Sequence, residues 1–145
     1  MAQLAKRLEA YGPTTFHDWN DTSVIPLIHN VRETKTAVIG FSLGANQLGW
    51  IDSHILRDID LGVAYDPSRQ SPLVTPMTDG SYIQRAPHFR RLLCYHNPGT
   101  WFYGGSRYVG SHVETIHIDT AHLAVQFSEE LHGRTIAAVK ALEKS

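Results

Sequence analysis

The sequence is poor in cysteine, in excess charge of either sign and in long apolar runs. Cys94 is the only cysteine, so no intramolecular disulfide can form and nothing indicates an oxidising compartment. The 13 Lys and Arg residues nearly balance the 14 Asp and Glu residues, so we expect no nucleic-acid partner. Lys6, Arg7 and Glu9 interrupt any signal-peptide core, and no run reaches the ~18 apolar residues of a membrane span. The expected location is therefore the cytoplasm.

Apolar residues are abundant by comparison, and the chain is of ordinary domain size. Of the 145 residues, 42% are hydrophobic and only 19% are charged. This composition favours a packed globular protein over a disordered one. The length leaves too little sequence for two independent cores, so we predict one domain over residues 1–145.

Short apolar segments alternate with segments of helical periodicity. Residues 36–41 are typical of a parallel strand buried on both faces. Residues 67–89 contain four prolines and are long enough to predict a functional loop or lid. The alternation predicts a three-layer α/β/α fold with a mostly parallel sheet of about five strands. We expect strands at 14–19, 36–41, 61–65, 91–95 and 113–118, and helices at 1–11, 43–57 and 122–144. A further helix, capped by residues 20–22, is expected to run through Ile25, Ile28 and His29.

The segment Gly40-Phe41-Ser42-Leu43-Gly44 joins an expected strand to an expected helix. It matches G-x-S-x-G, the pattern of a strained turn that lifts a serine hydroxyl out of the sheet. Both glycines are expected to avoid collisions of Cβ atoms in the tight turn. The helix that follows would favour developing negative charge at its N-terminus. The alternative is an ordinary strand–helix turn with a capping serine.

With this motif the chain resembles an α/β-hydrolase over nearly its whole length. The resemblance implies a catalytic triad in the chain order serine, acid, histidine. His122 follows the last expected strand and would be the base that accepts the Ser42 proton. His112 and His117 are the rivals, before and inside that strand. The alternative role for His122 is a hydrogen bond to a local carbonyl at a helix start.

The acid of the triad departs from the commonest family pattern. In most members it follows the strand that here ends before Asn97, and this segment has no carboxylate. A minority, including lipases of the pancreatic type, use the preceding strand, which here ends at Asp66. We therefore predict Asp66 as the acid, with a turn aspartate ahead of Pro67 as the alternative. Asp119 lies only three residues before His122 and is expected to form a local cap.

The N-terminal part lacks the strand and Gly-rich loop that supply an oxyanion-hole amide in the family. Leu43 still offers one backbone N–H, and residues 18–21 are the first place to look for a second donor. Either the natural start lies upstream, or a rearranged minimal fold fills the gap. Strand 14–19 must then pair directly with strand 36–41, or else leave an open sheet edge. An open edge predicts a homo-oligomer or an upstream segment that covers it.

These residues together predict a serine hydrolase that cleaves an ester or thioester through an acyl-enzyme at Ser42, without a cofactor. The alternative is a weakly active or inactive hydrolase-like domain that binds an acyl-type ligand or a protein partner. Phe41, Trp101 and Tyr103 are the expected substrate contacts; Trp101 and Tyr103, with Tyr108, either form an aromatic wall over the substrate or stabilise a long loop. The nine histidines lack the spacing of a metal site, so no metal is expected. Cys94 is predicted to be a buried apolar residue.

Overall fold

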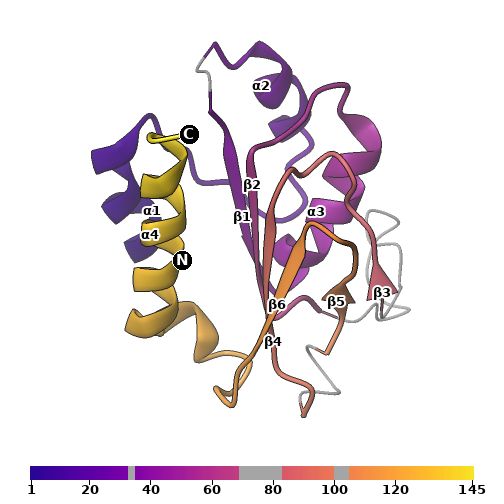
Figure 1. The fold of residues 1–145 in the computed structure, drawn as a ribbon, viewed down its shortest axis with the longest axis vertical. Coiled ribbons are helices and arrows are strands. Elements are labelled where there is room, and N and C mark those ends of the chain that lie inside the picture. The colour runs from indigo at the N-terminus through magenta and orange to yellow at the C-terminus, as the bar shows by residue number, and fades with distance from the viewer. Residues whose placement is uncertain (33–34, 69–82, 100–104) are drawn as a thin grey trace.

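A computed structural model describes residues 1–32, 35–68, 83–99 and 105–145. Its central sheet has four parallel strands in the order β1-β2-β4-β6 (Figure 1). The register aligns Phe41, Tyr65 and Tyr95 across three neighbouring strands. Parallel strands need crossover connections, and α3 (Leu43–His54) provides the one between β1 and β2. The strands are β1 Ala37–Phe41, β2 Leu61–Tyr65, β4 Leu92–His96 and β6 Val113–His117.

Helices cover both faces of this sheet (Figure 1). Helices α1 Ala2–Leu8 and α4 Glu129–Leu142 pack on one face, in a core with Leu61, Val63 and Tyr65. Helices α2 Val24–Asn30 and α3 Leu43–His54 pack on the other face. The two central strands β2 and β4 are buried at every position, because apolar layers cover them on both sides. The predicted α/β class with a mostly parallel sheet is confirmed.

The predicted first strand, 14–19, is wrong. These residues contain no helix or strand, and Phe16 is 63% exposed. The His17 ring instead makes local hydrogen bonds, 2.8 Å to Asp21 Oδ2 and 2.9 Å to Thr15 Oγ1. These bonds hold the side chains of this segment to one another rather than to a neighbouring strand. The main sheet therefore has four strands rather than about five in the described part of the chain, and β1 lies at its edge.

Other elements differ from the sequence predictions mainly at their ends. The first helix stops at Leu8 and continues as a short 3₁₀ turn, η1 Glu9–Tyr11. The last helix begins later than residue 122, after a second 3₁₀ turn, η2 Val125–Phe127, with Ser128 as its N-cap. A small parallel pair, β3 Ile83–Gln84 and β5 Arg107–Tyr108, was not expected. Most of the predicted excursion, 69–82, lies outside the described residues.

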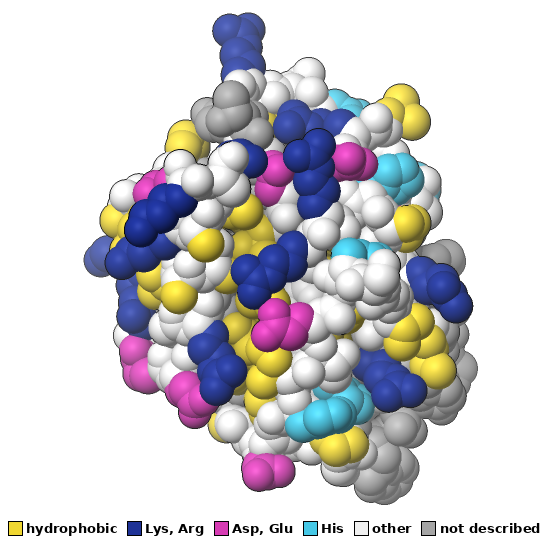
Figure 2. Space-filling model, in the orientation of Figure 1, with side chains coloured by type: hydrophobic (Ala, Val, Ile, Leu, Met, Phe, Trp, Pro, Cys, Tyr) yellow, Lys and Arg dark blue, Asp and Glu magenta, His cyan; other side chains and the backbone are white. Residues whose placement is uncertain are grey.

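Charged side chains of both signs are interspersed over the face of the molecule drawn in Figure 2. Three ion pairs join exposed groups at 2.8 to 3.0 Å: Arg7 with Glu129, Arg91 with Glu114, and Arg134 with Glu130. Exposed pairs of this kind contribute little to stability. In the described ranges, no helix has both the length and the apolar character needed to cross a membrane.

Candidate active site

The turn between β1 and α3 holds Ser42 in a strained backbone conformation. Its φ of 56° lies in the left-handed region, which a residue with a side chain rarely adopts. A Cβ on Gly40 would collide with the Gly44 carbonyl, so Gly40 is needed for this turn. A Cβ on Gly44 would approach Trp19 Cβ only at 4.0 Å. The expectation that both glycines are sterically required is therefore wrong for Gly44.

Three side chains from different parts of the sequence meet beside this turn. Ser42 Oγ lies 2.8 Å from His122 Nε2, and His122 Nδ1 lies 2.7 Å from Asp66 Oδ2. Asp66 directly follows β2, and His122 lies in the loop between β6 and η2. Asp66 is fully buried and His122 is 6% exposed. The structure therefore brings the predicted serine, acid and histidine together in one hydrogen-bonded row.

The backbone around Asp66 fixes the direction of its carboxylate. Asp66 has a φ of 42°, and its N–H donates to the Tyr95 carbonyl at 2.7 Å. The Asn97 backbone N–H donates to Asp66 Oδ1 at 3.1 Å, and the Asn97 side chain donates to the Thr120 carbonyl at 2.9 Å. Asn97 thus links Asp66 to the loop that carries His122. Sequence reasoning noticed only that Asn97 is no carboxylate and missed this role.

The rival residues lie away from this row. Asp119 is exposed, and no contact joins it to His122 among the described residues. His117 is exposed at the end of β6, where its ring centroid lies 5.9 Å from that of His96. His112 lies in the turn before β6. Within the described ranges, His122 is the histidine within hydrogen-bonding distance of Ser42.

Leu43 is the first residue of α3, so its N–H has no acceptor within the helix. This N–H is the predicted oxyanion donor, and the positive end of a 12-residue helix adds to its field. Residues 18–21 make a local turn, in which the Asp21 N–H donates to the Asp18 carbonyl.

A large hollow of about 1330 Å³ runs along the free edge of β1. Its lining includes Phe41 and Gly44 beside Ser42, Trp19 from the N-terminal segment, and Leu27 from α2. Apolar side chains dominate the walls, but one wall is the unpaired backbone of an edge strand. An alkyl chain alone would leave those N–H and C=O groups without hydrogen bonds. The hollow therefore combines apolar walls with backbone groups that can form hydrogen bonds.

Of the three predicted substrate contacts, only Phe41 lies within the described residues. The Phe41 ring stacks on the His122 ring with 5.3 Å between centroids, beside the row of polar side chains. Trp101 and Tyr103 lie outside the described residues. Tyr108 is fully buried, and its hydroxyl donates to the Ala45 carbonyl at 2.7 Å, so it anchors β5 to α3 rather than forming a wall.

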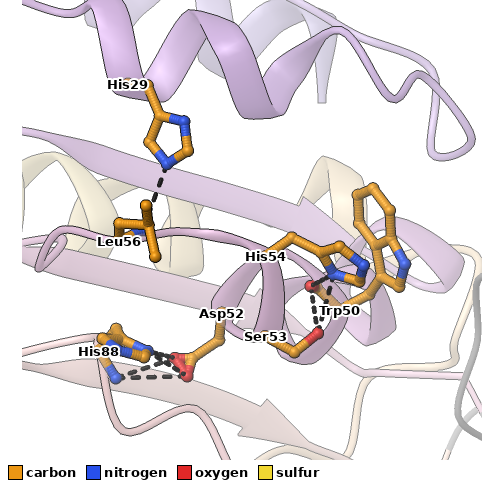
Figure 3. A network of polar contacts seen from close by, with 7 residues as sticks. All are labelled: His29, Trp50, Asp52, Ser53, His54, Leu56 and His88. Carbon is orange, nitrogen blue, oxygen red and sulfur yellow. Dashed lines mark hydrogen bonds and ion pairs between the residues drawn. The ribbon is translucent and has the colours of Figure 1, made fainter.

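Several other histidines make separate polar contacts near the far end of α3 (Figure 3). His88 contacts the buried carboxylate of Asp52, through both its backbone N–H and its ring. His54 lies against Trp50 and Ser53, and His29 accepts the Leu56 N–H. No group of three or more metal-ligating side chains occurs in the part of the chain that the structure describes. The His88 contact joins a loop to α3, the His54 contacts lie within α3, and the His29 contact joins α2 to the segment after α3.

Burial keeps the thiol of Cys94 uncharged. This side chain lies in β4 with no exposed surface, and burial raises the pKa of the thiol to about 11. The thiolate is the reactive form, and at neutral pH almost none of it is present. Cys94 therefore packs as the small apolar residue that the sequence predicted.

Comparisons with protein-family models, with curated proteins and with solved structures found no match for this chain. The function must therefore be argued from the chemistry of the site.

Proposed function

We propose that this chain is a serine hydrolase with an α/β-hydrolase-like fold that cleaves a carboxylic ester or thioester. The observation that carries the proposal is the hydrogen-bonded row Ser42–His122–Asp66. Ser42 and Asp66 lie 80 and 56 residues from His122 in the sequence. Their side-chain oxygens nevertheless lie 2.8 and 2.7 Å from the two ring nitrogens of His122. An α/β fold hosts many unrelated functions, so the proposal rests on this row and not on the fold.

The geometry supports a two-step reaction that begins with transfer of the acyl group to Ser42. His122 Nε2 takes the hydroxyl proton of Ser42 as Oγ attacks the carbonyl carbon of the substrate. The imidazolium then gives this proton to the departing alcohol or thiol. The bond between the acyl carbon and the leaving group breaks, and an acyl-enzyme remains.

Water completes the cycle in the second step. His122 removes a proton from the water molecule that attacks the acyl carbon, and returns it to Ser42 Oγ as the acid departs. Asp66 stays ionised throughout, holds the Nδ1 proton of His122 and stabilises the imidazolium. The burial of Asp66 strengthens this interaction, because little water screens the charges.

The oxyanion would receive one hydrogen bond from the Leu43 N–H. A site with this donor alone favours the alternative, a hydrolase-like domain that binds an acyl-type ligand or a protein partner and turns over little. The loss of one such donor lowers turnover on the order of 10²–10³. We therefore expect slow turnover but an intact nucleophile.

Intact-mass analysis after treatment with a fluorophosphonate tests the proposal. We expect one adduct on the unmodified chain and none on Ser42→Ala. Ser53→Ala is the matched control, because Ser53 is an exposed serine at the other end of α3, and it should label as the unmodified chain does. Absence of any adduct on the folded, unmodified chain would favour the binding domain.

A panel of esters and thioesters with acyl chains of graded length would then define the substrate class. We expect the acyl chain to affect kcat through both steps, because the acyl group remains on Ser42 until deacylation, whereas the alcohol affects acylation alone.

A further inference from the structure

Ser68 is the residue next to the candidate nucleophile that sequence reasoning missed. It lies two residues after Asp66, is 4% exposed, and its Oγ is 2.7 Å from Ser42 Oγ. Its backbone is already tied to the nucleophile turn on both sides. The Ser68 N–H donates to the Ser42 carbonyl at 3.1 Å, and the Asn46 side chain donates to the Ser68 carbonyl at 2.7 Å. The hydroxyl group is therefore not needed to close this loop.

Counting protons shows which serine donates in the contact between the two hydroxyl groups. A carboxylate only accepts hydrogen bonds, so the His122 nitrogen that faces Asp66 carries a proton. In the neutral ring the other nitrogen, Nε2, is then an acceptor, and it takes the single hydroxyl proton of Ser42. Ser42 has no second proton to offer. Ser68 must therefore donate to Ser42 Oγ.

We propose that Ser68 is a further catalytic residue, whose hydroxyl stabilises negative charge on Ser42 Oγ during acyl transfer. This proposal rests on the hydrolase function proposed above. A hydrogen bond to a charged oxygen is about twice as strong as one to a neutral oxygen. The Ser68 bond therefore stabilises the transition state more than the resting state, which is the condition for a gain in rate.

The contribution applies to both steps. In acylation, Ser42 Oγ bears negative charge as its proton moves to His122 and its bond to the acyl carbon forms. In deacylation, that bond breaks after water has added, and Oγ again carries charge until His122 returns the proton. Ser68 keeps its own proton throughout, so it neither consumes nor releases one. In the acyl-enzyme, Ser42 Oγ is an ester oxygen and a weak acceptor. The hydrogen bond from Ser68 therefore stabilises this intermediate least.

The test compares Ser68→Ala with Ser68→Thr and with Ser106→Ala. We expect Ser68→Ala to lower both the rate of fluorophosphonate labelling and kcat for an ester about 10- to 100-fold, the scale of one hydrogen bond to a charged group. KM and the melting temperature should change little. Ser68→Thr keeps the hydroxyl and should recover most of the rate. Ser106→Ala removes another buried hydroxyl, which contacts Gln84 rather than Ser42, and should retain the rate.

The outcomes separate this proposal from the function on which it rests. If Ser42 labels at the same rate in Ser68→Ala as in the unmodified chain, the role of Ser68 is wrong and the hydrolase function stands. An equal loss in Ser68→Ala and Ser106→Ala, with lowered melting temperatures, would indicate a structural role and also overturn the proposal. If the folded, unmodified chain neither labels nor turns over ester, both proposals fail together.

Discussion

Asp66 is the proposed acid of the site, and its surroundings fix the direction of its carboxylate. It lies beyond the end of β2 in a left-handed conformation, with its carboxylate between His122 and the Asn97 backbone. Within the next strand, β4, the Tyr95 carbonyl accepts the Asp66 N–H, and just after β4 the Asn97 backbone N–H donates to the Asp66 carboxylate.

We predict that Asp66→Asn lowers turnover by up to ~10⁴ and leaves the chain folded, because an amide no longer holds the productive tautomer of His122. The measurement is kcat for an ester, with circular dichroism to establish folding. Asp119→Asn is the control, since Asp119 is exposed, and its effect should be small. A larger loss from Asp119→Asn than from Asp66→Asn would contradict the assignment of the acid.

His132 should make the chain sensitive to acid. It is fully buried on α4, and its Nε2 donates to the Gln126 carbonyl at 2.8 Å. Burial lowers the pKa of His132, an effect that the Gln126 carbonyl and the Glu129 carboxylate oppose more weakly. Below its ordinary pKa of about 6.5, the unfolded chain therefore binds more protons than the folded one. Stability should fall as the pH drops from neutral through this range.

Thermal unfolding at a series of pH values measures this effect. His132→Gln offers a side-chain amide to the Gln126 carbonyl and cannot titrate, so its melting temperature should fall less on acidification. His54→Gln, at an exposed position, should behave like the unmodified chain. Part of the acid sensitivity should remain in His132→Gln, because burial also lowers the pKa of His96. Identical pH profiles for His132→Gln and the unmodified chain would rule out this explanation.

At the scale of elements, the join between β1 and α3 shows that the two glycines of one motif have unequal roles. Gly40 lies where the helix start crosses the strand end, whereas Gly44 lies inside the helix, where a Cβ would make only an ordinary contact with Trp19. The pattern in the sequence treats the two positions alike. Only the path of the backbone distinguishes them.

We predict that Gly40→Ala destabilises the chain by about 1–3 kcal/mol or more, since the new methyl group meets a backbone carbonyl that cannot move aside. Gly44→Ala should change the free energy of unfolding by less than about 1 kcal/mol, because alanine is favoured in a helix. Urea unfolding of the two variants measures both effects. Equal destabilisation by the two substitutions would show that the turn needs both glycines.

At the scale of the whole molecule, the outer edge of β1 has no neighbouring strand among the described residues. It borders a hollow of about 1330 Å³ with apolar walls, and residues 14–19 pass nearby without pairing with it. Each backbone group left without a partner away from water costs about 1–3 kcal/mol. A strand from outside residues 1–145 would satisfy these groups and fill part of the hollow.

We predict that the 145-residue chain associates through this edge. Light scattering coupled to gel filtration should give a mass above that of the monomer. Ala37→Lys, which places a charge at the exposed start of β1, should lower that mass, because charged edge residues oppose strand pairing. If residues upstream of Met1 form the covering strand, adding them should give a monomer with a higher melting temperature. A monomeric chain that such residues do not stabilise would contradict the prediction.

The sequence by itself determined the strands of the main sheet and the three residues of the hydrogen-bonded row. The buried strands β2 and β4 could be predicted, because continuous apolar runs have few other solutions. Strand β6 could be predicted too, although none of its positions is fully buried. Ser42, Asp66 and His122 could be placed by a short motif and by chain order. Residues 14–19 could not be predicted, because β-prone side chains form a strand only beside a partner, and here local bonds of His17 prevail.

Only the tertiary structure decided which groups surround the row. Ser68 and Asn97 have no motif, and they matter because parallel strands end at the same edge of the sheet. Ser42 follows β1 and Ser68 follows β2, so the distance between them depends on the pairing of these two strands. No local pattern in the sequence encodes such a distance. The free edge of β1 likewise exists only in three dimensions, because strand order follows from packing rather than from the order of the chain.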